Sequence, residues 1–280
     1  MKQTTSVFIL FILLLSAAPT RAQYEGFVQE GEFGLQLGAA HYFGDLNTQT
    51  GLRQPGFTAG GFYRRQFNNY AALRIAANYA RLGYSDRLQA SNEFQQRRNL
   101  SFRTNIWELL LQGDFNFFRF NPTNPHQRFT PYLTFGAGVF YYDPFTELNG
   151  QRHFLRPLGT EGQFSAQYPE RKPYGNTALT VPFGVGIKWA LHPGMNLQLE
   201  VTHRFTGTDY LDDVSTTYAG LSAFDPGTPA FLLQDRSYEL GPRIGTAGTQ
   251  RGFSGQKDQY ILVTLGVSWN ITSYKCPTGN

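Results

Sequence analysis

Cysteine is almost absent from this 280-residue sequence, and so are long apolar runs. The one cysteine, Cys276, cannot form an internal disulfide, so it is either an unpaired thiol or a bridge to another protein. No apolar run reaches the about 20 residues that a membrane-spanning helix needs. Runs of Lys or Arg are missing too and the net charge is only +4, which argues against a nucleic-acid-binding protein.

The start of the chain has the pattern of a secretory signal peptide. Lys2 supplies a positive charge, Val7 to Leu15 is an apolar run, and small or polar residues lead to Ala22. This order is typical of a cleaved export signal. We therefore expect a signal peptide at 1–22 and a mature outer-membrane β-barrel domain at 23–280.

Aromatic residues and glycine are abundant where helix-forming residues are not. The sequence is 16% aromatic, with 25 Phe and 16 Tyr, and it contains 30 Gly. A soluble helical protein would carry more Leu, Ala, Glu and Lys. Many aromatics and glycines without long apolar runs are typical of β-barrel membrane proteins.

Apolar and polar residues alternate with a period of two, which places each set on one face of a strand. In the segment 196–205, for example, Leu197, Leu199 and Val201 alternate with Gln198 and Glu200. Strands of about 5–6 residues are usual in soluble proteins, whereas a tilted strand needs about 9–11 to cross a bilayer. The eight predicted strands have the longer length and span 32–43, 56–67, 70–83, 102–117, 130–142, 178–190, 195–206 and 258–271.

The connections between these strands alternate between long and short. The short ones are Asn68-Asn69, 118–129 and 191–194, whereas the other four are 44–55, 84–101, 143–177 and 207–257. Outer-membrane barrels have short periplasmic turns and long extracellular loops. The sequence therefore predicts an all-β fold, an eight-stranded antiparallel transmembrane β-barrel, with both termini in the periplasm of a bacterium.

Aromatic residues lie near both ends of the predicted strands, as expected of interfacial girdles, although an aromatic-rich chain could also place them there by chance. The periplasmic set is Phe33, Phe67, Tyr70, Phe115, Tyr132, Trp189 and Trp269. The opposite set is Phe43, Phe57, Tyr79, Tyr141 and Phe205.

Charged residues share the inward face of the strands, where unpaired charge would be costly. We expect an ion-pair network that fills the lumen; the alternative is a narrow ion path, which a barrel of eight strands leaves little room for. Arg64 lies on the same polar face. The predicted lumen network consists of Arg74, Glu108, Asp114, Lys188, Glu200 and Arg204.

Catalytic and metal-binding patterns are weak. The five histidines (His41, His126, His153, His192 and His203) do not share a face with a Ser or carboxylate partner. We therefore expect no enzyme activity and no cofactor. An aspartate cluster in the stretch TDYLDDVS, with Asp45 nearby in the first loop, could bind calcium but lacks the spacing of an EF-hand. We expect these carboxylates to accept hydrogen bonds from loop N–H groups instead.

Seven stretches resemble the PorG-like outer-membrane barrel family, which is associated with the type IX secretion system. The stretches begin with EFGLQLGAAHYFGDLN, IWELLLQGDFNFF, FTPYLTFGAGVFYYDP and VPFGVGIKW, continue with the loop segments RPLGTEGQ and HRFTGTDYLDDVSTTY, and end with RGFSGQKDQYILVTLGVSW. The two loop segments are the most distinctive. Their candidate interaction residues are Leu158, Gly159, Thr160, Glu161, Gly162 and Gln163, with Thr208, Asp209, Tyr210, Leu211, Asp212, Asp213, Val214 and Ser215.

The resemblance covers Glu32 to Ile271 and implies a non-enzymatic role. It implies a component of the type IX protein secretion machinery that sits in the outer-membrane lipid bilayer and contacts periplasmic lipoprotein ring subunits. Two alternatives stay open. One is a stand-alone small barrel that acts as an anchor, adhesin or narrow channel, and the other is a lipid-modifying enzyme.

Overall fold

The computed structural model describes residues 28–48, 53–89 and 92–273. The predicted signal peptide and Cys276 lie outside the described residues. Within the described ranges, no helix combines the length and the apolar character that crossing a membrane requires. Residues Gln29–Ile271 form one compact unit.

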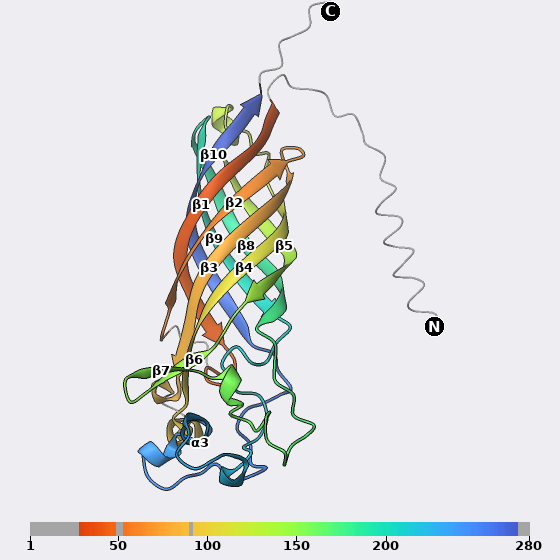
Figure 1. The fold of residues 1–280 in the computed structure, drawn as a ribbon. Helices are drawn as coiled ribbons and strands as arrows, with labels where there is room; N and C mark the ends of the chain where they lie inside the picture. The colour runs from red at the N-terminus through yellow and green to blue at the C-terminus, as the bar shows by residue number, and fades with distance from the viewer. Residues whose placement is uncertain (1–27, 49–52, 90–91, 274–280) are drawn as a thin grey trace, which may run out of the picture. The chain divides into compact units, whose positions relative to one another are not determined.

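A closed barrel of eight antiparallel strands forms the body of this unit (Figure 1). Each strand pairs with the next one around the ring, and the last strand pairs with the first, so no barrel edge stays open. The eight predicted strands are confirmed, with ends that differ by up to four residues. The strands are β1 (Val28–Phe43), β2 (Gly56–Gln66), β3 (Ala71–Ser85), β4 (Ser101–Asn116), β5 (Phe129–Tyr141), β8 (Thr177–His192), β9 (Met195–Thr206) and β10 (Gln259–Ser273).

The outer wall of the barrel is apolar on all eight strands. Leu35 is 62% exposed, Leu179 is 68% exposed and Leu265 is 55% exposed, whereas the alternating neighbours of such residues are buried. A soluble monomer rarely exposes a contiguous apolar patch of more than a few hundred Å². A wall of this kind therefore requires apolar surroundings.

Glycine permits close backbone approach at the seam between β1 and β10. A Cβ atom on Gly38 would lie 1.9 Å from the carbonyl oxygen of Val263 in β10. Inside the barrel, Gly186 leaves room for the ring of Tyr132, because a Cβ atom on Gly186 would lie 2.5 Å from Cζ of that ring. Each glycine thus leaves the space that a neighbouring strand or ring occupies.

The predicted loop 143–177 contains a short hairpin that the alternation did not reveal. Strands β6 (Phe145–Leu148) and β7 (Gln151–Phe154) pair with each other, and β6 also contacts β4 through Phe145 and Arg103. Asn149 (φ 53°) and Gly150 (φ 76°) form the two-residue turn. An Asn-Gly pair of this geometry is a strong hairpin signal, so the sequence did contain the information.

Helical turns occupy other parts of the loops. The α-helices among the described residues are α2 (Glu93–Arg98) and α3 (Pro229–Leu233). The 3-10 turns are η1 (Asp86–Leu88), η2 (Pro125–Gln127), η3 (Arg156–Leu158), η4 (Leu221–Ala223) and η5 (Ser237–Glu239). Figure 1 shows that β6, β7, α3 and the long loops gather at one end of the barrel. We call this the loop end, the opposite one the turn end, and the packed loops the loop cap.

Aromatic side chains ring the outer wall near both ends, with one exception. Phe33 and Trp269 stack at the turn end with 5.5 Å between ring centroids, and Tyr79 and Trp107 lie 4.9 Å apart toward the loop end. Tyr132 is 0% exposed, so its predicted place in the girdle is wrong. Its even position in β5 turns it inward, because the outward set of that strand is odd-numbered.

Candidate functional site

Buried charges fill the turn-end half of the lumen. Glu32 of β1 accepts a hydrogen bond from Arg64 of β2, and the ammonium of Lys188 lies 3.4 Å from the same carboxylate oxygen. Arg64 also donates from Nε to Asp114 at 2.5 Å. All four side chains are at most 1% exposed, so each charge is neutralised inside the barrel rather than by water. Sequence reasoning missed Glu32 and left Arg64 out of the network.

The same network continues across the barrel through Arg74. Its guanidinium lies 2.7 Å from Glu200 of β9 and 3.5 Å from Asp114 of β4. The hydroxyl of Tyr132 donates to Glu200 at 2.7 Å. The inward ring of Tyr132, misplaced by the girdle prediction, is therefore part of the lumen filling.

A separate ion pair lies nearer the loop end, where Arg204 donates from Nε to Glu108 at 3.1 Å. The lumen set thus holds four bases and four acids: Arg64, Arg74, Lys188 and Arg204 with Glu32, Glu108, Asp114 and Glu200. Equal numbers leave no net charge to attract ions of one sign. The structure places all six predicted lumen residues in these pairs.

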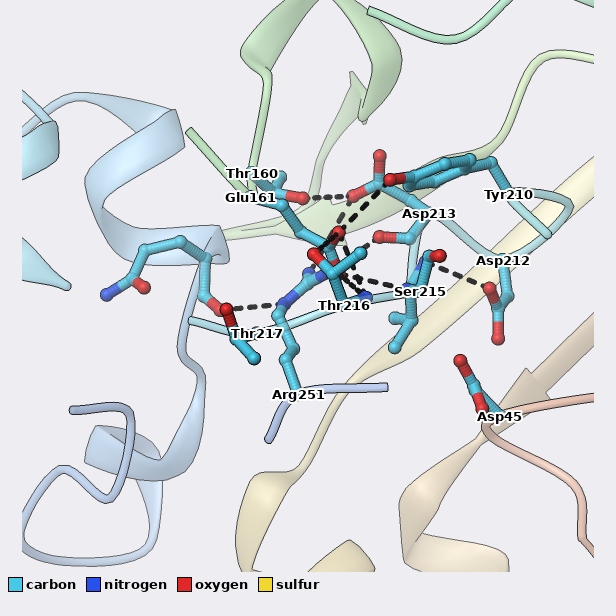
Figure 2. A network of polar contacts seen from close by, with 12 residues as sticks. Asp45, Thr160, Glu161, Tyr210, Asp212, Asp213, Ser215, Thr216, Thr217 and Arg251 are labelled. Carbon is cyan, nitrogen blue, oxygen red and sulfur yellow. Dashed lines mark hydrogen bonds and ion pairs between the residues drawn. The ribbon is translucent and has the colours of Figure 1, made fainter. Parts of the chain in front are cut away.

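The two distinctive loop segments meet in the loop cap, around the carboxylate of Glu161 (Figure 2). Its oxygens accept hydrogen bonds from the N–H of Ser215 at 2.9 Å and from the hydroxyl of Thr216 at 2.7 Å. Tyr210 donates its hydroxyl at 3.3 Å, and Arg251 donates from Nη1 at 3.1 Å. One buried acid therefore joins loop 143–177 to two parts of loop 207–257.

Asp213 is the second junction of the cap. Thr160 and Tyr174 both donate hydroxyl protons to its carboxylate, the latter at 2.6 Å. Arg251 lies 3.7 Å away, and burial raises the pKa of Asp213 to about 6 despite this positive charge. Asp213 also has a left-handed backbone (φ 66°), which Asp tolerates better than most residues.

A tyrosine at the end of β1 fastens the cap to the barrel. The Tyr42 hydroxyl lies 2.5 Å from Asp212 and 2.9 Å from Asp258, and all three side chains are buried. A hydroxyl has one proton to donate, so the second contact requires that one carboxyl keeps its own proton. Burial raises the pKa of both Asp212 and Asp258 well above the usual value, and a neighbouring carboxylate adds to the rise, Asp45 for Asp212 and Asp212 for Asp258.

A bidentate ion pair connects the second loop to the same cap. Arg98, at the end of α2, donates to Asp86 from Nη2 at 2.7 Å and from Nε at 2.8 Å. Its Nη1 donates to the backbone carbonyl of Arg251 at 2.5 Å. Sequence reasoning missed Tyr42, Arg98, Arg251 and Asp258, because each is a single residue with a partner in another loop or strand.

Most predicted loop residues are buried inside the cap. Leu158, Thr208 and Tyr210 are half-buried, and the other eleven are buried. Asp209 accepts a hydrogen bond from Ser215 at 2.5 Å, and burial raises its pKa to about 6. Within the described ranges, no group of three or more His, Cys, Asp or Glu is placed to hold a metal ion. These aspartates accept hydrogen bonds from loop N–H and hydroxyl groups.

Comparison with solved structures finds small barrels at low identity, and no curated protein matches the sequence. Neisserial surface protein A is 13% identical, with 88% of this chain and 100% of that chain covered and a TM-score of 0.41. Ail of Yersinia pestis, in complex with the heparin analogue sucrose octasulfate, is 11% identical, with 86% and 99% covered and a TM-score of 0.40. The outer membrane protein OprG from Pseudomonas aeruginosa is 11% identical, with 87% and 99% covered and a TM-score of 0.35.

A sequence-family model also matches this chain. It matches residues 5–156, just over half of the chain, which includes β1 to β5 and the β6–β7 hairpin. The chain belongs to the family described as domain of unknown function DUF6089.

Proposed function

We propose that this protein is a non-enzymatic β-barrel of the bacterial outer membrane that serves a type IX protein secretion machinery. The observation that carries the membrane assignment is the apolar outer wall on all eight strands around a polar interior. Only a closed barrel satisfies every strand hydrogen bond in a bilayer, and this sheet is closed. The loop end faces outward and the turn end faces the periplasm.

The filled interior favours a structural role over transport. The charges of the lumen are paired, and the loop cap is packed through Glu161, Asp213 and Tyr42. A continuous water path would have to break several buried ion pairs, each of which is costly to separate. We therefore expect no discrete conductance when the purified protein is inserted into planar bilayers. Steady single-channel openings would favour the stand-alone channel instead.

The secretion role is supported by the resemblance of the loop segments RPLGTEGQ and HRFTGTDYLDDVSTTY to the PorG-like family. Their contact through Glu161 and Ser215 supplies a physical reason for the two segments to occur together. Since most of their side chains are buried, we infer that they stabilise the cap. The contact with periplasmic lipoprotein ring subunits then falls to the turn end, where Phe67 is 65% and Phe118 is 57% exposed.

Deletion and co-purification test this role. Deleting the gene should block export of cargo that carries a type IX signal, and the native protein should recover ring subunits from outer membrane in mild detergent. Replacing Phe118 with Asn should reduce that recovery. The matched control is Phe164→Asn, because Phe164 is 61% exposed but belongs to the loop cap. Normal cargo export in the deletion strain would refute the secretion role and leave the stand-alone barrel.

A further inference from the structure

The charged side chains on the outward face of the barrel have one sign. Along the described parts of the eight strands, the Lys, Arg, Asp and Glu residues at outward positions are Arg65, Arg81 and Arg103. The strand carboxylates Glu32, Glu108, Asp114 and Glu200 turn inward and are buried. Glu30, near the start of β1, is exposed but lies at an even position, on the side of the strand opposite the outward apolar set. An arginine on the lipid-facing wall is tolerated near an interface but is costly at the midplane of a bilayer.

Two of these arginines lie together at the loop end, directly beyond the aromatic pair. Tyr79 pairs with Trp107 across β3 and β4, Arg81 pairs with Asn105 one step further, and Arg103 pairs with Gly83. Arg81 and Arg103 are therefore diagonal neighbours on one face, about 7–8 Å apart at Cα, within reach of one group. The exposed side chain of Arg81 makes no hydrogen bond or ion pair with another of the described residues.

A small cavity of about 190 Å³ lies beside Arg103, between β3–β4 and the β6–β7 hairpin. Ser101 and Thr146, whose hydroxyls lie 3.1 Å apart, line it together with Tyr84. The Tyr84 hydroxyl is buried and has no hydrogen-bond partner in the part of the chain that the structure describes. A buried hydroxyl without a partner is uncommon. Tyr84 lies at an even position of β3 and turns inward, away from the face that carries Arg81 and Arg103.

We call the surface formed by Arg81, Arg103, Arg152 and Glu147 the rim of the loop end. The single acid of this rim does not cancel the charge of its three arginines. Glu147 accepts from Arg103 at 2.9 Å and lies opposite Arg152 in the hairpin. Arg81, Arg103 and Arg152 against Glu147 leave an excess of two positive charges at the rim. Both members of the Arg103–Glu147 pair are more than half exposed, and pairs of this kind contribute little stability. An anion can therefore replace Glu147 as the partner of the Arg103 guanidinium.

We propose that this rim binds the phosphate of a phosphorylated glycolipid in the leaflet that surrounds the loop end. Arg81 and Arg103 hold the phosphate, and Tyr79 and Trp107 contact the upper acyl chains. Guanidinium groups suit phosphate because they offer several donors in a planar fork. This inference rests on the proposed insertion of the barrel in a membrane.

The test uses the full-length protein in a maltoside detergent, which contains no phosphate. Bound lipid is counted by native mass spectrometry during titration with lipid A, and in parallel with lipid A from which the phosphates have been removed. The variants are Arg81→Gln, Arg103→Gln and the double variant. Arg65→Gln is the matched control, because Arg65 is an exposed, outward arginine at the turn end.

The double variant should bind lipid A about 25-fold more weakly than the native protein, because an arginine near a charged lipid surface contributes about fivefold and the two contributions multiply. The Arg65→Gln control should bind lipid A as tightly as the native protein does. The native protein should bind dephosphorylated lipid A weakly. Equal binding by the double variant, or by lipid without phosphate, overturns the proposal. Displacement of lipid by inorganic phosphate at equal concentration would assign the site to a free anion and overturn it as well.

The outcome is separable from the membrane assignment. If the barrel inserts into vesicles but does not distinguish the two lipids, only the lipid site fails. If it does not insert at all, the proposed function fails first. Each variant must keep the folded, fast-migrating band on unheated gels, so that lost binding is not lost folding.

Discussion

At the scale of single residues, the cap depends on a few buried carboxylates that each hold several donors. Glu161 accepts from Ser215, Thr216, Tyr210 and Arg251. Sequence reasoning found Glu161 through its motif, but could not find Arg251, because nothing near that arginine marks a partner that lies 90 positions away. Such pairs are set by tertiary packing alone.

Replacing Glu161 with Gln should loosen the cap. The amide leaves Arg251 buried without its charge partner, and separating a buried pair typically costs about 3–5 kcal/mol. Hydrogen exchange of backbone amides in 207–258 should speed up, while the barrel strands stay protected. Glu170→Gln is the control, since Glu170 is 67% exposed. Unchanged exchange in the first variant would mean that Glu161 does not hold the cap.

The stability of the cap should fall as pH rises. Asp213 and Asp209 have pKa values raised to about 6 by burial, and those of Asp212 and Asp258 are raised further. A pKa above the unfolded value means that the stabilising contribution is complete below the unfolded value, about 4, and is lost as pH rises through the folded one. Exchange of cap amides, corrected for intrinsic rates, should increase between pH 5 and pH 8.

A neutral substitute distinguishes this cause from general effects of pH. In Asp212→Asn the acid next to Asp258 can no longer ionise, so the pH dependence of cap exchange should become weaker. A variant with the same pH dependence as the native protein would assign the effect to other groups.

At the scale of elements, the sequence predicts long strands well and short ones poorly. Each barrel strand repeats its alternation over eleven or more residues, so chance agreement is small. Strands β6 and β7 have four residues each, which is too few for alternation to stand out. The hairpin was nevertheless encoded in Asn149-Gly150, where turn chemistry rather than hydrophobic pattern carries the signal.

Replacing Gly150 with Ala should weaken the hairpin by about 1 kcal/mol, because its φ of 76° is unfavourable for a residue with a Cβ. Hydrogen exchange in Phe145–Phe154 reports the change. Gly175→Ala is the control, since a Cβ there would approach no atom closer than 3.7 Å and the residue has no positive φ. Equal protection in both variants would show that the turn does not limit the hairpin.

At the scale of the whole molecule, the interior of the barrel holds buried acids and bases. Each of them needs a partner of opposite charge, because an unpaired buried charge is costly. Alternation predicts which residues turn inward, and so it identified six members of the lumen network. It cannot predict which acid meets which base, because that depends on how the strands are staggered around the ring. Glu32 was missed although it alternates with Phe33 and Leu35 at the start of a predicted strand, so its inward direction was readable from the same pattern.

Glu32→Gln should destabilise the barrel by several kcal/mol, since it leaves Arg64 and Lys188 without their shared acid. Urea unfolding in lipid vesicles, followed by tryptophan fluorescence, measures the loss. The control is Glu93→Gln, because Glu93 is exposed in the loop cap, outside the lumen. A native-like unfolding midpoint for Glu32→Gln would show that the lumen charges are not essential to the fold.

The contact across the seam has a consequence for how the polypeptide is made. Ser268 donates its hydroxyl to Glu32 at 2.5 Å, although 236 positions separate them. Contacts between such distant segments form slowly, because a long stretch of chain must be ordered first. The nascent protein therefore cannot finish its ring while it is still emerging from the ribosome, and until then both terminal strands expose unpaired backbone. Closing the ring therefore removes two edges that could otherwise pair with another chain.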